Sequence, residues 1–244
     1  MNLLMRDFKY QLNKFKYCNF IIFIISLIII VLSLSYKNQS IINYIFNFVL
    51  IDAGIISDFE DFFIPIFWIF MHILSPFILI IIFNKDHFVN GEQVMIKAKT
   101  KRKYFFSKCI ASSINIIIFI GIFLFSIFIA QLIFYEFDHS TKYFLIIGFT
   151  MLIENILLTW MGIIIILYSN TYIAILCILV NLILSILTNI HLFIGQQSLV
   201  YKQNEFGGIF TFKENFLLLF LYTIIFIIVA YIFFARYDFY GVEK

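Results

Sequence analysis

Long apolar runs separated by short polar intervals make up most of the chain. Six of these runs are long enough to cross a hydrocarbon core of roughly 30 Å, because a helix rises about 1.5 Å per residue. They cover residues 20–36, 63–83, 109–134, 143–168, 172–190 and 215–235. A seventh apolar run, residues 41–51, has only eleven residues and suits an interfacial or re-entrant helix better than a span.

The stretch before the first span has a different period. Apolar side chains recur every three or four residues within residues 2–17, at Leu4, Phe8, Leu12 and Phe15. Basic and polar residues lie elsewhere around the helix, at Arg6, Lys9, Asn13 and Lys16. This spacing is typical of an amphipathic helix that lies in the membrane interface with its apolar face toward the acyl chains. The alternative is a simple positively charged flank to the first span.

Composition agrees with a membrane location. Hydrophobic residues form 63% and charged residues 13% of the 244 residues, a balance that excludes an ordinary water-soluble domain. We therefore expect an all-α polytopic membrane protein in which residues 1–244 form a single transmembrane domain with six spans.

The basic residues indicate the orientation. Seven of the seventeen Lys and Arg residues lie in the interval 84–108, between the second and third spans. On the six-span layout thirteen basic residues fall on the side of the two termini and four on the other side, at Lys37, Lys142, Lys202 and Lys213. The positive-inside rule then places both termini in the cytoplasm of a bacterial-type plasma membrane.

The outer loops carry an excess of acidic residues. Eight acids lie on that side, and three of them, Asp58, Glu60 and Asp61, follow one another closely among aromatic residues. Acids are tolerated on either side of a membrane, so this bias has a trivial explanation. The alternative is an outer surface that steers cationic ligands.

Catalytic signatures are absent from the sequence. There is no His-Glu-x-x-His or Gly-x-Ser-x-Gly motif, no metal-ligand spacing among the four histidines, and no phosphate-binding loop. We therefore expect no catalytic residue, metal or cofactor in this chain, and no enzyme activity of its own. Nothing in the sequence suggests nucleic acid as a partner.

One acidic residue, Glu154, lies deep within a predicted span, beside Asn155, and His72 lies within another span. An ionisable side chain in hydrocarbon is costly unless it faces protein or water. These residues are candidates for a translocation path, and hydrogen bonding between helices explains Glu154 and Asn155 equally well.

The layout resembles the permease subunits of ABC-2 type exporters. The resemblance covers the full length: an N-terminal amphipathic helix, six spans with both ends inside, and a long basic loop after the second span. Members of the family often carry a Phe-x-x-x-Glu element there, matched by Phe88 and Glu92, and a basic residue ahead of a Lys, matched by Arg102 and Lys108. The Gly-Thr and Pro usual in this loop are absent.

The resemblance implies a coupling helix within residues 85–104 that docks on a separate ATP-binding subunit, which would hold ATP and Mg²⁺. Its apolar contacts would be Phe88, Val94 and Ile96, and its polar rim Glu92 and Arg102. It also implies a second permease copy or paralogue and contact with membrane lipid.

Small permeases of similar composition expel antimicrobial peptides such as lantibiotics. We expect the substrate to be an amphipathic, cationic peptide, in export or self-immunity. The alternatives are export of a lipid or hydrophobic drug, and a stand-alone membrane immunity protein that sequesters a peptide toxin. An integral membrane enzyme is the least favoured, because no catalytic constellation is present.

Overall fold

The chain folds as a bundle of long helices in the computed structural model, which describes residues 3–35, 40–50, 65–135, 137 and 139–237. The long helices are α1 (Leu3–Ser35), α3 (Ile66–Ala98), α4 (Lys101–Phe134), α5 (His139–Tyr168), α6 (Thr171–Leu187) and α7 (Phe212–Arg236). A short α2 (Ile41–Tyr44) continues into a π-helical segment, Ile45–Leu50.

Five of these helices, α1, α3, α4, α5 and α7, are long and apolar enough to cross a membrane. The chain is thus a multi-pass helical membrane protein. The remaining predicted span, residues 172–190, corresponds to α6, which has 17 residues and ends at Leu187. At about 1.5 Å per residue α6 reaches roughly 26 Å, short of a typical hydrocarbon core, so the count of six spans stays a prediction.

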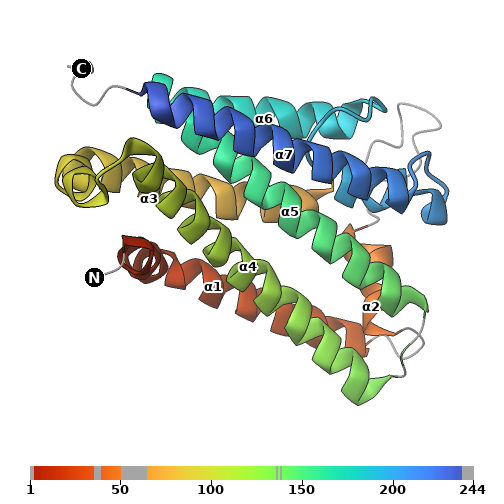
Figure 1. Cartoon of the computed structure of the whole chain (residues 1–244). Coiled ribbons are helices and arrows are strands. Elements are labelled where there is room, and N and C mark those ends of the chain that lie inside the picture. The colour runs from red at the N-terminus through yellow and green to blue at the C-terminus, as the bar shows by residue number, and fades with distance from the viewer. Residues whose placement is uncertain (1–2, 36–39, 51–64, 136, 138, 238–244) are drawn as a thin grey trace.

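Successive long helices run in opposite directions, as Figure 1 shows. The start of α1, the α3–α4 junction and the end of α7 therefore lie together at one end of the bundle (left in Figure 1). The junction is only two residues long. Lys99 adopts a left-handed conformation with φ of 63°, and the Thr100 side chain accepts a hydrogen bond from the Lys103 amide at 3.3 Å and caps α4.

The N-terminal segment differs from the expectation. The predicted interfacial helix and first span form one unbroken helix, α1, whose first turns are seen nearly end-on in Figure 1 while the rest runs across the view. Asp7, Gln11 and Phe15 are buried, whereas Leu4 and Phe8 are only partly covered. Of the predicted apolar face only Phe15 is buried, because α1 packs chiefly against α4, which offers polar partners to Asp7 and Gln11.

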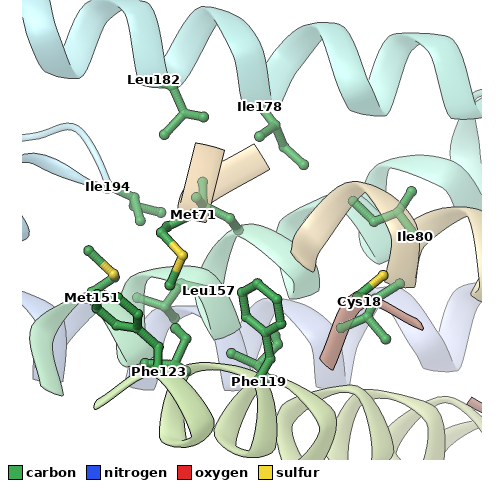
Figure 2. Close-up of a cluster of buried hydrophobic side chains, with 14 of the residues drawn as sticks. Cys18, Met71, Ile80, Phe119, Phe123, Met151, Leu157, Ile178, Leu182 and Ile194 are labelled. Atoms are coloured by element: carbon green, nitrogen blue, oxygen red, sulfur yellow. The ribbon is translucent and has the colours of Figure 1, made fainter. Parts of the chain in front are cut away.

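Apolar side chains from α3, α4 and α6 meet in the centre of the bundle. In Figure 2 Phe119 and Phe123 rise from α4 toward Met71 of α3, and Ile178 and Leu182 reach down from α6. All five side chains are at most 2% exposed. This contact holds α3, α4 and α6 around a common core.

A small-residue face on α5 allows close helix packing. A Cβ atom at Gly162 would lie 2.1 Å from Cδ1 of Ile80 in α3 and 3.3 Å from that of Ile178 in α6. Neighbouring Thr159 is fully buried and donates back to the carbonyl of Asn155 at 2.8 Å. The missing side chain at Gly162 is what lets α3 approach α5 here.

The apolar run at 41–51 is described up to residue 50. Helix α2 lies at the end of the bundle away from the α3–α4 junction (Figure 1), where the Ile42 amide donates to Oε1 of Gln131 in the last turns of α4 at 3.4 Å. Ile41, Ile42 and Ile45 are fully buried. The described part of this segment is too short to span a membrane, and it packs against the neighbouring helices.

This arrangement predicts which ends are reachable from outside the cell. In a variant with Cys18, Cys109 and Cys177 replaced by Ala, we expect Lys213→Cys to react with a membrane-impermeant maleimide in intact cells. Lys103→Cys should react only after the membrane is opened, because it lies at the basic end that the positive-inside rule assigns to the cytoplasm. Both parent side chains are exposed. Labelling of Lys103→Cys in intact cells would contradict this orientation.

Candidate functional site

Four charged side chains from three helices form a buried cluster at the end that carries the α3–α4 junction. Arg6 of α1 donates to Oδ1 of Asp7 at 2.7 Å and to both carboxylate oxygens of Asp86 in α3, at 2.9 and 2.8 Å. The Lys108 ammonium of α4 also contacts Asp86 and lies 3.4 Å from Asp7. We call Arg6, Asp7, Asp86 and Lys108 the ionic cluster.

The ionic cluster is electrically balanced and extensively hydrogen-bonded. Asp7 and Lys108 are each 1% exposed and Asp86 is 2% exposed. Ser107 donates to the second Asp7 oxygen at 2.6 Å, and Asn90 donates to Asp86 at 3.0 Å. Buried charges are tolerated only when paired and hydrogen-bonded, so the two cations and two anions depend on one another.

Sequence reasoning missed this cluster, although it contained a signal. Asp7 and Gln11 are four residues apart on α1, and Lys108, Ser112 and Asn115 follow at intervals of four and three on α4. Both sets are polar stripes, and the structure joins them: Ser112 and Asn115 donate to Oε1 of Gln11 at 3.2 and 3.4 Å. A matched pair of polar stripes on two apolar helices is the pattern that would have predicted their contact.

A buried histidine joins the residue that follows α7 to the same region. The two ring nitrogens of His87 lie 3.1 Å from the Tyr104 hydroxyl and 3.0 Å from the Tyr237 hydroxyl. The His87 ring stacks on Phe83, with centroids 5.6 Å apart. The residue that follows α7 is thereby attached to α3 and α4.

The predicted coupling segment, residues 85–104, covers the last turns of α3, which runs unbroken to Ala98, and the start of α4 at Lys101. Phe88 is 63% exposed and Ile96 77%, and Glu92 lies exposed between them at intervals of four. Val94 is only 8% exposed, because rotation of about 100° per residue puts it on another side of the helix. We call Phe88, Val89, Glu92 and Ile96 the exposed α3 face.

Arg102 contacts another helix of the same chain. Its guanidinium lies 3.7 Å from the ring centroid of Tyr231 in α7 and donates to the Tyr231 hydroxyl at 2.6 Å. The family resemblance assigns Arg102 to the ATPase interface, whereas its described contact joins α4 to α7.

The candidate translocation residues meet in the interior. Oε2 of Glu154 lies 3.0 Å from Nε2 of His72, and Oε1 accepts the Ser198 amide at 3.0 Å. The Ser198 hydroxyl in turn accepts from the Trp68 indole at 2.8 Å. Asn155 accepts from Ser75 at 3.0 Å. The predicted trio therefore belongs to one buried polar region, and Ser198 was missed because its segment lies far away in the sequence.

Geometry fixes the number of protons in the Glu154–His72 pair. Nδ1 of His72 lies 2.9 Å from the carbonyl oxygen of Trp68 and must carry a proton to bond to it. Nε2 faces a carboxylate oxygen, so one further proton is shared between His72 and Glu154. The pair is neutral overall, both side chains are fully buried, and both Glu154 oxygens have partners. This arrangement favours helix-to-helix hydrogen bonding over an open ion path.

The loop between α6 and α7 folds into the bundle, and one of its side chains caps the C-terminal end of the short α6. Lys202, expected on the outer surface, is only 3% exposed, and its ammonium donates to the carbonyls of Ser185 and Thr188 at 2.5 Å each. Burial lowers the pKa of Lys202 to about 8, and the two carbonyls favour the charged form, so at pH 7 Lys202 is a cationic cap on α6.

The remaining predicted ligand residues, Asp58, Glu60 and Asp61, lie outside the described residues. Among the residues that are described, no three His, Cys, Asp or Glu side chains come close enough together to hold a metal ion.

Breaking the ionic cluster should destabilise the protein strongly. Lys108→Met leaves the two buried carboxylates with one cation, and we expect the free energy of unfolding in detergent to fall by about 3–5 kcal/mol. Adding Asp7→Asn restores the charge balance and should recover part of that loss. The exposed Lys103→Met is the matched control and should change little. A double variant no more stable than Lys108→Met would contradict the balanced-charge account.

Substitution at Glu154 separates structure from transport. The amide of Glu154→Gln can donate to Nε2 of His72 and still accept the Ser198 amide, so the thermal midpoint in detergent should stay near wild type. Glu154→Leu should destabilise by about 1–3 kcal/mol for each partner left unsatisfied. If the chain is a permease, as its sequence pattern predicts, Glu154→Gln should keep transport activity. A stable Glu154→Gln protein without transport would instead assign Glu154 to the translocation path.

Comparison of the chain with protein-family models, with curated proteins and with solved structures finds no match. Its function must therefore be argued from the sequence pattern and the geometry described above.

Proposed function

We propose that the chain is the permease subunit of an ATP-driven exporter of the ABC-2 type. The observation that carries this proposal is the length of α3 together with the position of its charged residues. With 33 residues, α3 is roughly 50 Å long and exceeds a hydrocarbon core of about 30 Å. All of its charged residues lie from Lys85 onward, so this end projects beyond the hydrocarbon on the basic side.

The exposed α3 face is suited to a protein partner. Phe88, Val89 and Ile96 are 63–77% exposed on the polar part of the helix, around the carboxylate of Glu92. Apolar side chains grouped in water with a charged neighbour are typical of docking surfaces. The ATP and Mg²⁺ of such an exporter would be bound by the partner chain, which would dock here.

A force exerted by a docked partner on the exposed α3 face would be transmitted to several helices. Asp86 lies one residue from His87, and these two residues join α3 to α1, α4 and the end of α7. Rigid tilting of packed helices is a common way of turning subunit closure into a change of membrane access. The permease proposal thus gives the ionic cluster a mechanical role.

The substrate proposal rests on the sequence alone. An amphipathic cationic peptide fits the acidic outer residues Asp58, Glu60 and Asp61. Lipid or hydrophobic-drug export, and sequestration of a peptide toxin without ATP, are the competing functions. A second permease copy or paralogue would complete the transporter if the chain exports a peptide, or if it exports a lipid or hydrophobic drug.

Substitution on the exposed α3 face tests the proposal. We expect an ATP-hydrolysing chain to co-purify with the wild type from native membranes. The double variant Phe88→Asp with Ile96→Asp should lose that chain and lower transport at least tenfold. Insertion should persist, because both side chains lie outside the core. Lys103→Asp adds an acid at the same end but off α3, and should leave the complex intact.

Two results would contradict the proposal. One is a wild-type chain that brings down no protein with a phosphate-binding loop and ATPase activity, which would favour the stand-alone immunity protein. The other is an intact, active complex in the double variant, which would move the docking surface elsewhere.

A further inference from the structure

A cavity of about 320 Å³ lies between the first turn of α1 and the last turns of α3. It is lined by Leu3 and Arg6 from α1 and by Val94 and Lys97 from α3. Two cationic side chains thus face it together with two apolar ones. Of the lining residues only Val94 belongs to the predicted coupling contacts, and the cavity lies on a different side of α3 from Phe88 and Ile96.

Positive charge is directed into the cavity and negative charge away from it. The Arg6 side chain is 20% exposed, whereas its carboxylate partners Asp7 and Asp86 have side chains 0–2% exposed. Arg6 uses three N–H groups on those carboxylates, and a guanidinium has five. Lys97 is exposed and forms no ion pair with any residue that the structure describes.

The surroundings reinforce the positive potential. Residues 3–16 and 85–108 together carry eleven basic and three acidic side chains. The remainder of α1 and the earlier part of α3 have no charged residue. The first turns of α1 and the last turns of α3 bend away from the bundle axis and are seen nearly end-on in Figure 1, so the cavity stays close to the level where the hydrocarbon core ends. In that layer of a bacterial-type membrane the abundant anions are phospholipid phosphates.

We propose that this cavity binds the phosphate group of an anionic phospholipid, which thereby bridges α1 and α3. Arg6 and Lys97 would donate to the phosphate oxygens, since guanidinium and ammonium groups form strong charge-assisted hydrogen bonds with phosphate. Leu3 and Val94 would contact the apolar part next to the headgroup. The inference requires only that the chain spans a membrane and does not depend on the transport proposal.

The test measures lipid binding by the full chain in detergent micelles, by native mass spectrometry and by the shift of the thermal midpoint. Phosphatidylglycerol, phosphatidylcholine and inorganic phosphate are added separately at matched concentrations. We expect phosphatidylglycerol to bind and stabilise the wild type more than phosphatidylcholine does. Lys97→Gln should weaken the binding about fivefold, the effect of one lysine at an anionic surface.

Two further variants separate a defined site from general attraction. Lys103→Gln removes an exposed cation at the same end but away from the cavity, and phosphatidylglycerol binding should be unchanged. Val94→Phe fills the cavity without altering charge, and binding should be lost. If Val94→Phe fails to fold, Lys97→Gln and Lys103→Gln still decide the matter.

Three outcomes would overturn the proposal. Equal weakening by Lys97→Gln and Lys103→Gln would mean diffuse attraction to the basic surface. Equal binding of the two lipids would mean that no phosphate-specific site exists. Stabilisation by inorganic phosphate as large as that by phosphatidylglycerol would assign the cavity to a soluble anion.

Discussion

The cost of burying charged and polar groups in hydrocarbon is the constraint on which the rest of the structure depends. A charged side chain carried into the interior needs a partner from the protein, because hydrocarbon offers none. Asp7 and Lys108 meet across α1 and α4, and Glu154 and His72 meet across α5 and α3. Apolar packing brings the helices together, and these polar pairs decide which faces meet.

The ionic cluster makes the last turns of α3 part of a rigid unit. Its charges are balanced only while α1, α3 and α4 stay in place, so the three helix ends move together. The exposed α3 face and the cavity beside Val94 lie on different sides of this unit. A docked partner and a bound lipid would therefore both contact the last turns of α3. Binding of one would change the position of this helix end and so influence binding of the other.

The candidate site shows where sequence reasoning succeeds and fails. Glu154 stands out in a sequence because a carboxylate within a span is costly, and it lies at the centre of a buried polar region. Its partner Ser198 carries no comparable signal, since a serine in a loop is ordinary. Val94 was grouped with Phe88 and Ile96 by its apolar character alone, although helical rotation puts it on a different side.

The sequence by itself determined that the chain is a multi-pass helical membrane protein, where most helices lie, and which end is basic. These properties follow from the composition of each segment, because partition into hydrocarbon depends on a segment's own side chains. The tertiary structure decided that α1 buries Asp7 and Gln11, that α3 continues to Ala98, and that Lys202 caps a shortened α6. Those features depend on neighbours distant in the sequence, and a local pattern holds no information about which neighbour a side chain will meet.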